Sequence, residues 1–158
     1  MAVLGRLERL LEASGVPYTH NVHASVYTAR EVAALEHLPQ HRFAKAVLLK
    51  DEDGFIMAVL PADYAVDLHE LRDALGRKHA RLANEKELGE QFPDCELGAM
   101  PPLGNLYGLP TWMESSLVSE KQVAFNAGTH RDVVYMSLED FRRLAAPRIL
   151  HFARTTSH

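Results

Sequence analysis

One lysine and two glycine-bearing loops are the parts of this sequence best suited to chemistry. Lys45 lies near the start of an otherwise apolar stretch, FAKAVLLK, at residues 43 to 50. A lysine at a strand end commonly extends its stem along apolar surface and keeps its charge in water. The alternative is an ammonium that faces a cleft and meets an anion or a polarised carbonyl. The strand alone leaves both interpretations open.

The loop LGAMPPLG at residues 97 to 104 has the composition of a cradle for an anion or a carbonyl oxygen. Gly98 and Gly104 bracket Pro101 and Pro102, so the loop is permissive at its ends and stiff in the middle. The amides near its first glycine are the candidate donors to such an oxygen: Gly98, Ala99 and Met100. A plain turn has the same composition, and this alternative also stays open.

A second glycine-bearing loop, at residues 126 to 130, follows a predicted strand. Gly128 allows close approach of the backbone to a ligand, and His130 is a candidate base, hydrogen-bond donor or plain surface residue. His20 and His23 lie three residues apart, which on a strand points them to opposite faces. With one cysteine and no His-x-x-x-His helix, the sequence predicts no metal site and no cofactor.

Nucleophilic catalysis has little support in the sequence. Cys95 has no neighbouring cation or histidine that would lower its pKa, and no serine occupies a Gly-x-Ser-x-Gly elbow. The carboxylates at residues 51 to 53 are interpreted as turn residues, although a paired-carboxylate mechanism stays open.

The elements that must position these residues begin with two helices and a hairpin. Leucines at helical spacing predict a helix at residues 2 to 14, followed by a short strand at 18 to 22. Thr28 and Glu31 form a capping box for a helix that runs to about residue 37. Two apolar strands, 45 to 50 and 55 to 60, are joined by a turn that ends in Gly54.

The second half of the chain is predicted to hold three more helices and several strands. Asp67 caps a helix that Gly76 stops, Asn84 with Glu87 caps a helix over 84 to 91, and Ser137 caps a last helix to residue 144. Strands are expected at 79 to 83, 111 to 118, 122 to 126 and 132 to 136. The fold class is therefore α+β (mixed α/β), a single domain over residues 1 to 150. Residues 151 to 158 are expected to form a tail, mobile from residue 153.

Length, composition and charge bound the function. The 158 residues are 47% hydrophobic, enough for one core, and no apolar run is long enough to cross a bilayer. We therefore expect a cytoplasmic protein with no membrane partner. A formal net charge of -4 argues against a broad basic surface and against a DNA partner. Four basic residues at 72 to 81 are either a local phosphate contact or a solvated helix end.

The order of the motifs resembles the YbaK/prolyl-tRNA synthetase editing-domain family of aminoacyl-tRNA deacylases. The sequence has Phe-x-Lys at residues 43 to 45, Leu-Pro-Ala-Asp at 60 to 63, Leu-Ala-Asn at 82 to 84, the loop at 97 to 104, and Ala-Phe-Asn-Ala-Gly at 124 to 128. The resemblance covers residues 16 to 147. It implies a mixed, mostly antiparallel sheet with flanking helices.

The resemblance also implies a function and a site. The activity would be hydrolysis of the ester that joins a wrong small amino acid to the acceptor end of a transfer RNA, without a metal or a covalent intermediate. Lys45 would be the family's strand lysine, and Gly98, Pro101 and Gly104 would match its glycine–proline loop. Glu114 departs from the expected aspartate. A non-catalytic module that binds an aminoacyl or nucleotide ligand is the alternative, because a fold does not guarantee its chemistry.

Overall fold

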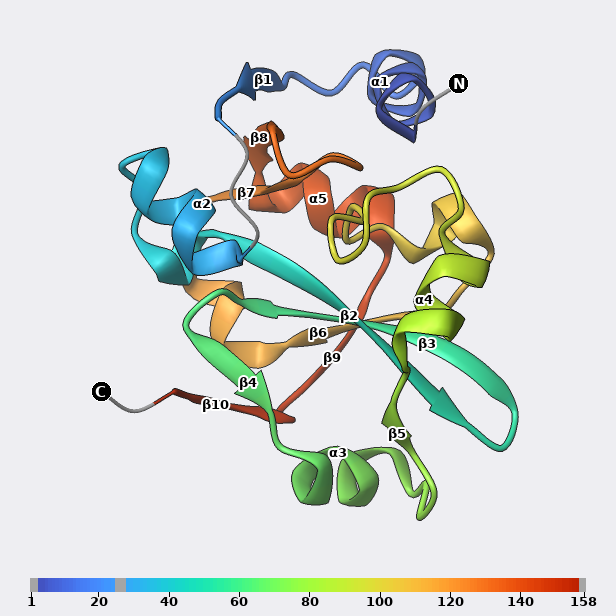
Figure 1. The fold of residues 1–158 in the computed structure, drawn as a ribbon. Helices are drawn as coiled ribbons and strands as arrows, with labels where there is room; N and C mark the ends of the chain where they lie inside the picture. Colours follow the sequence, from blue (N-terminus) through green and yellow to red (C-terminus); the bar gives the residue numbers. More distant parts are fainter. Residues whose placement is uncertain (1–2, 25–27, 157–158) are drawn as a thin grey trace.

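The computed structural model describes residues 3 to 24 and 28 to 156 (Figure 1). The side chains of residues 5 to 24 and 28 to 156 are described. The elements follow in this order: α1 (Val3–Ala13), β1 (Thr19–Val22), α2 (Ala29–Leu35), β2 (Ala44–Asp51), β3 (Gly54–Pro61), β4 (Tyr64–Val66), α3 (Leu68–Leu75), β5 (Arg81–Leu82), α4 (Glu85–Gln91), β6 (Thr111–Glu114), β7 (Gln122–Asn126), β8 (Asp132–Ser137), α5 (Leu138–Ala145), β9 (Arg148–Leu150) and β10 (Ala153–Thr155). Three short 3-10 helices, η1 (Gln40–Arg42), η2 (Gly104–Tyr107) and η3 (Ser115–Ser119), lie between them.

The strands form three sheets. The largest has the order β5-β2-β3-β6-β9, the second β1-β8-β7 and the third β10-β4. Strand β6 runs parallel to β3 and to β9, while the other strand pairs within the sheets are antiparallel. The prediction of a mixed, mostly antiparallel α+β fold is confirmed.

Local sequence signals explain most of the elements. Thr28 and Asn84 each make the predicted capping box, and Asp67 and Ser137 cap α3 and α5 through their side chains. In the β2–β3 turn, the carboxylate of Asp51 accepts hydrogen bonds from the amides of residues 53 and 54, at 2.8 and 3.1 Å. The carboxylates at residues 51 to 53 are therefore turn residues, as the sequence indicates.

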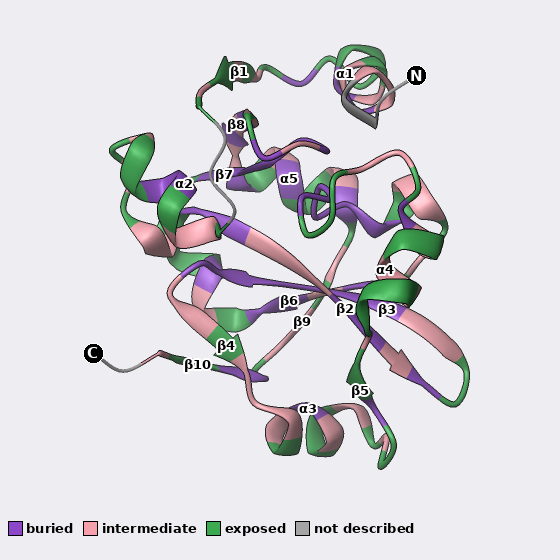
Figure 2. Cartoon of the chain, in the orientation of Figure 1, coloured by how far each residue is buried: buried purple, intermediate pink, exposed green. Residues whose placement is uncertain are grey.

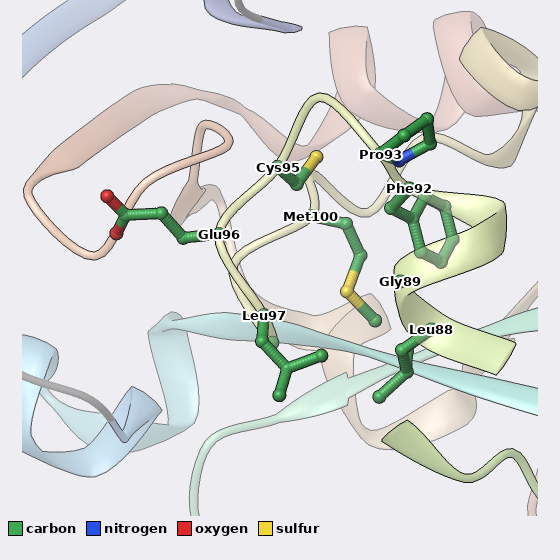
Figure 3. A pocket seen from close by; sticks show the side chains of 9 residues that line it. Leu88, Gly89, Phe92, Pro93, Cys95, Glu96, Leu97 and Met100 are labelled. Carbon is green, nitrogen blue, oxygen red and sulfur yellow. The ribbon is translucent and has the colours of Figure 1, made fainter. Parts of the chain in front are cut away.

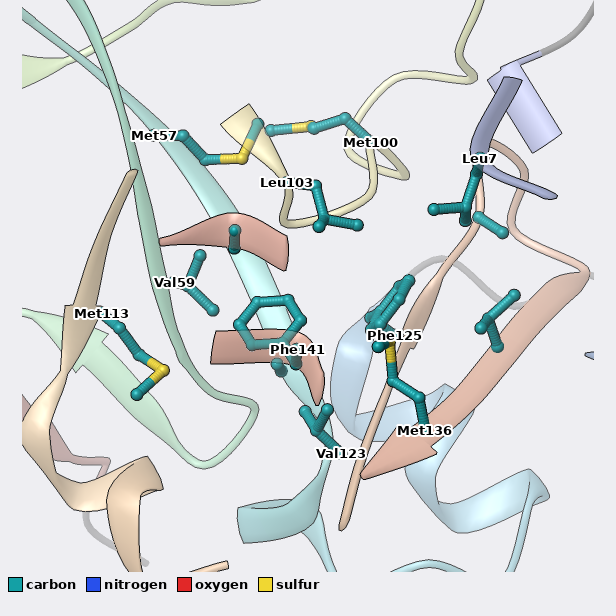
Figure 4. Packing of buried hydrophobic residues seen from close by; sticks show 14 of the residues in the cluster. Leu7, Met57, Val59, Met100, Leu103, Met113, Val123, Phe125, Met136 and Phe141 are labelled. Carbon is teal, nitrogen blue, oxygen red and sulfur yellow. The ribbon is translucent and has the colours of Figure 1, made fainter. Parts of the chain in front are cut away.

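The main hydrophobic core lies between the large sheet, the β1-β8-β7 sheet, α1 and α5 (Figure 4). A second cluster packs α3 and β10 against the large sheet, and a third lies under α2. The third cluster holds Val32, Ala33, Phe43, Ala62, Ala124 and Val133. Figure 2 shows exposed residues on the outer sides of the helices and buried residues along the central strands. Within the described ranges, no helix combines the length and apolar character needed to span a membrane.

The expectation of a tail at residues 151 to 158 is wrong, because most of this segment is part of the fold. Phe152 and Ala153 are fully buried, and residues 153 to 155 pair with β4 in antiparallel register. The buried carboxylate of Glu114 accepts hydrogen bonds from the amides of both residues, at 2.9 and 3.1 Å. The polar composition of the C-terminus hid this anchor, which depends on a residue almost 40 positions earlier.

Two further expectations differ from the structure. The strand predicted at 111 to 118 ends at Glu114, whose side chain caps η3 by accepting from the amide of Ser116 at 2.7 Å. The strand predicted at 79 to 83 shrinks to residues 81 and 82. Both segments run along the large sheet, so tertiary pairing and not local composition sets their length.

Candidate functional site

Direct hydrogen bonds join the two glycine-bearing loops. The amide of Gly128 donates to the carbonyl of Ala99 at 2.8 Å, and the amide of Glu96 donates to the carbonyl of Gly128 at 2.8 Å. Gly128 is buried with φ +97, a backbone conformation that favours glycine. The loops at 97 to 104 and 126 to 130, which the sequence identifies separately, therefore form one unit.

His130 belongs to this unit as a connector. It is buried, with 6% of its surface exposed, its amide donates to the carboxylate of Glu96 at 2.7 Å, and its Nε2 lies 2.7 Å from the carbonyl oxygen of Leu97. A carbonyl only accepts, so Nε2 carries the proton. Figure 3 shows Glu96 reaching away from the neighbouring pocket. Sequence reasoning missed Glu96, which has the appearance of an ordinary surface glutamate.

The start of the first loop presents two unused amides. Gly98 is exposed and has φ +82. The amide of Ala99 already donates to the carbonyl of Glu96 at 3.0 Å, whereas those of Gly98 and Met100 have no acceptor among the described residues. Ala99 is therefore removed from the predicted oxyanion donors, and Gly98 and Met100 remain.

The rest of the loop is packed into the protein and holds these amides in place. The side chain of Met100 lies in the main core, where it points toward that of Met57 (Figure 4), and Pro101 and Pro102 are buried. Gly104 is predicted to contact substrate, but the structure gives another reason for a glycine at this position. A Cβ there would lie 2.5 Å from the hydroxyl of Thr111, so close packing within the chain requires the glycine.

Lys45 lies on a stretch of the β2 edge where strand pairing is interrupted. On this edge β2 pairs with β5 only at residues 49 and 50, and a single bridge joins Phe43 to Ala124 of β7. No described strand pairs with the edge between these points. Strand β7 continues from the bridge into the loop that contacts Ala99. Lys45 thus lies where β2 and β7 separate, close in the fold to the joined loops.

The Lys45 ammonium is partly buried, unlike the charge of a solvated strand end. Burial lowers the pKa of its ammonium, and the positive charge of Arg30 lowers it further, while Asp63 opposes both. Within the described part of the chain, its side chain makes no hydrogen bond or ion pair. A partly desolvated cation without a partner is suited to bind an anion or a developing oxyanion. Sequence reasoning did not foresee that Arg30 of α2 and Asp63, in the turn after β3, are neighbours of Lys45.

A pocket of about 160 Å³ lies behind the first loop (Figure 3). It is lined by Leu88, Gly89, Phe92, Pro93, Cys95, Glu96, Leu97, Gly98 and Met100. Lys45 does not line it, and its apolar residues pack with Ala44 and Leu48, which alternate with Lys45 along β2. The pocket therefore lies on the other side of the strand from the ammonium and supports the loop.

Cys95 is inert, as the sequence indicates. Burial raises the pKa of its thiol to about 11, and the sulfur lies 3.1 Å from the hydroxyl of Tyr107. A thiol with this pKa is almost entirely protonated near neutral pH and is a poor nucleophile. No group of three or more histidine, cysteine or acidic residues in the described ranges is arranged to hold a metal ion.

The three arginines of the basic cluster at residues 72 to 81 are engaged within the protein. Arg72 donates to the carbonyl of Ala80 at 2.9 Å, Arg77 pairs with Asp53, and Arg81 pairs with Glu87 at 2.8 Å. The ion pair with Arg81 lowers the pKa of Glu87 to about 2. Of the two interpretations of this cluster, these contacts support a helix end over a phosphate contact, because the arginines already have partners in other segments of the chain.

The chain thus forms a small α+β domain in which two glycine-bearing loops are joined by hydrogen bonds and a lysine of β2 is partly buried. The family model of the aminoacyl-tRNA editing domain matches residues 23 to 144. The chain belongs to this family.

Known relatives cover nearly the whole chain. It is 29% identical over 156 residues to the multifunctional Ser/Thr-tRNA deacylase ProXp-y of Escherichia coli (strain K12), covering 95% of this chain and 92% of the relative. It is 26% identical to the prolyl-tRNA editing protein ProX of Acetoanaerobium sticklandii, covering 90% and 88%. A solved structure described as a candidate trans-editing enzyme for prolyl tRNA synthetase superposes with a TM-score of 0.83 at 20% identity, covering 98% of both chains.

Proposed function

We propose that this protein is a trans-editing hydrolase that removes a small amino acid, serine, threonine, alanine or cysteine, from mischarged transfer RNA. The family and the names of its deacylase and editing relatives support this activity over a non-catalytic binding module. Proline transfer RNA or a similar one is the proposed carrier, and the cytoplasm, where charged transfer RNA is used, is the proposed location. The acceptor end would be the part that the protein holds.

The proposal rests on the Lys45 ammonium, which makes no hydrogen bond or ion pair with the described residues, and on the Gly98 and Met100 amides, which have no acceptor among those residues. An aminoacyl ester is already activated, so its hydrolysis needs placement of water and stabilisation of the oxyanion more than a strong nucleophile. The loop offers donors for the oxyanion, and Lys45 offers a positive charge for the carbonyl or a phosphate.

The reaction would run as a direct hydrolysis. Water adds to the acyl carbon, and negative charge collects on the former carbonyl oxygen, where the Gly98 and Met100 amides stabilise it. The bond between the acyl carbon and the ribose oxygen then breaks, and a proton from the attacking water ends on that ribose oxygen. The products are a free amino acid and an intact transfer RNA, and neither a metal nor an acyl-enzyme takes part.

The test is deacylation of a panel of mischarged transfer RNAs by the purified protein, before and after exhaustive treatment with EDTA. We expect release of at least one small amino acid well above the rate of spontaneous hydrolysis, with no effect of the chelator. Binding of aminoacyl-tRNA without turnover would instead support the non-catalytic module. Activity that EDTA removes and zinc restores would contradict the metal-free mechanism.

A further inference from the structure

Asn126 has a buried side-chain oxygen without a partner. The residue ends β7 with 8% of its surface exposed, and its Oδ1 is buried without any hydrogen bond among the described residues. A buried carbonyl oxygen that accepts nothing costs about 1 to 3 kcal/mol. Buried polar groups in folded proteins are almost always paired, so an orphan of this kind indicates a missing donor.

The strand register places Asn126 near Lys45. On β7, Val123 and Phe125 belong to the main core, and Ala124 belongs to the cluster under α2. Because side chains alternate along a strand, Asn126 lies on the face of Ala124. Its cross-strand neighbour Val133 lies in the same cluster.

The same alternation applies to β2. Phe43 lies in the cluster under α2 and forms a parallel bridge with Ala124. Lys45 and Asn126 each follow two residues later on their strands, so their side chains lie on the same face. The Asn126 oxygen that lacks a partner among the described residues therefore lies on the same face as Lys45, where β2 and β7 separate.

The charge around Asn126 selects the kind of donor. Two cations, Lys45 and Arg30, lie in this region: burial lowers the pKa of the Lys45 ammonium, the positive charge of Arg30 lowers it further, and Asp63 opposes both. A substrate ammonium would be repelled there, whereas a neutral hydroxyl would not be. Among the small amino acids proposed as substrates, serine and threonine carry a hydroxyl group on the β-carbon.

We propose that Asn126 determines specificity by accepting a hydrogen bond from the side-chain hydroxyl of a seryl or threonyl group. This inference rests on the proposed function and refines its substrate class. Alanine has nearly the same shape as serine but would leave the oxygen unpaired. A site that hydrogen-bonds a hydroxyl group discriminates strongly against an analogue that lacks it.

The experiment compares kcat/KM on one proline transfer RNA charged with serine or with alanine. The wild type should prefer serine by about tenfold or more. This factor is at the lower end of what is expected when alanine leaves the buried acceptor without a partner. Asn126→Leu keeps the branching at Cγ, enlarges the side chain and removes the acceptor, so the serine preference should fall by about tenfold, through slower removal of serine. Val133→Ala disturbs the packing beside Asn126 and leaves the acceptor, so it should keep the wild-type ratio.

The outcomes separate this inference from the proposed function. A wild type that removes serine and alanine equally well, or removes alanine faster, would overturn the role of Asn126, and this result depends on no variant. Asn126→Leu that slows both substrates equally would overturn it too, and would indicate a purely structural residue or one that holds water. A wild type that deacylates no transfer RNA would overturn the proposed function itself.

Discussion

At the scale of single residues, Lys45 is the most informative position. Burial lowers the pKa of its ammonium, so the folded protein carries this charge at a cost in free energy. Among the described residues, the Lys45 side chain makes no hydrogen bond or ion pair that would offset this cost. A charge maintained at such a position is expected where it acts on a ligand.

Replacement of Lys45 by methionine should therefore separate activity from stability. Lys45→Met keeps the aliphatic stem and removes the charge, so we expect deacylation to fall by about two orders of magnitude, as for loss of one oxyanion donor. The melting temperature at pH 7 should not decrease, because the variant no longer carries a partly buried charge. Lys50→Met is the matched control: Lys50 lies on the same strand over the ring of Phe55, 4.5 Å from its centroid. If Lys45→Met kept wild-type turnover, Lys45 would not belong to the site.

The dependence of the deacylation rate on pH follows from the lowered pKa of Lys45. The wild type needs the charged ammonium, and the pKa of Lys45 lies below that of an ordinary lysine. The rate above background hydrolysis should therefore decrease as the pH rises through this lowered value, and Lys45→Met should show no such decrease.

At the scale of elements, the joined loops explain why residues 97 to 100 can act through their backbone. Gly98 has φ +82, and a Cβ there would lie 3.9 Å from Cε1 of His130, an ordinary contact. A larger residue at this position would therefore act by changing the backbone conformation and not by a clash.

Gly98→Val should lower kcat/KM by about 10²- to 10³-fold if it displaces one oxyanion donor. Gly76→Val tests the conformational cost alone, because Gly76 ends α3 with φ +64 and a Cβ there would meet nothing within 4 Å. Both variants should lose similar stability, measured by urea unfolding, and only the first should lose activity. Near wild-type kinetics for Gly98→Val would mean that the loop is a plain turn.

The Glu114 carboxylate joins three elements. It accepts from the amides of Ser116, Phe152 and Ala153, and His151 lies 3.0 Å away. Burial alone would raise the pKa of Glu114, but these hydrogen bonds outweigh it and lower the pKa. The departure from the aspartate that the family resemblance implies therefore serves the attachment of β10.

Glu114→Gln should destabilise the fold by about 1 to 3 kcal/mol, because the neutral amide has one acceptor oxygen and leaves a buried donor unpaired. The folded pKa is lowered, so the stabilisation is present above the unfolded value near 4.5 and is lost as the pH falls through the folded value. Urea midpoints should thus converge for wild type and variant in acid. Glu90→Gln, on the exposed side of α4, should match the wild type throughout. An unchanged midpoint for Glu114→Gln at pH 7 would contradict this role.

At the scale of the whole molecule, charge limits how transfer RNA can be held. The net charge is -4, and the arginines at 72, 77 and 81 are engaged with groups of the protein. Arg154 pairs with Asp67 and Glu70 at 2.7 and 2.8 Å. With this net charge and these arginines engaged within the protein, an extended footprint on the transfer RNA is not expected.

The corresponding measurement is the salt dependence of binding an uncleavable aminoacyl-tRNA. Two or three phosphate contacts predict a slope of log K against log salt of only about -1.5 to -2. A short acceptor-stem mimic should bind nearly as well as the whole molecule. A slope steeper than about -5, or a mimic that binds far more weakly, would show a larger interface.

The sequence by itself determined the elements whose signals are local. The capping residues Thr28, Asn84 and Ser137, and the turn before Gly54, act within three or four positions, and each does what its residue type predicts. The order of the motifs also identified the family, and with it the fold and the class of reaction. These features need no knowledge of which distant segments meet.

The tertiary structure alone decided how the site is assembled. Gly128 meets Ala99, Lys45 gains Arg30 and Asp63 as neighbours, and Glu114 fixes a C-terminus that its composition had suggested was mobile. Each contact joins residues 15 to 39 positions apart. Their pairing depends on strand register and on packing in three dimensions, which residue types and spacing along the chain do not encode locally.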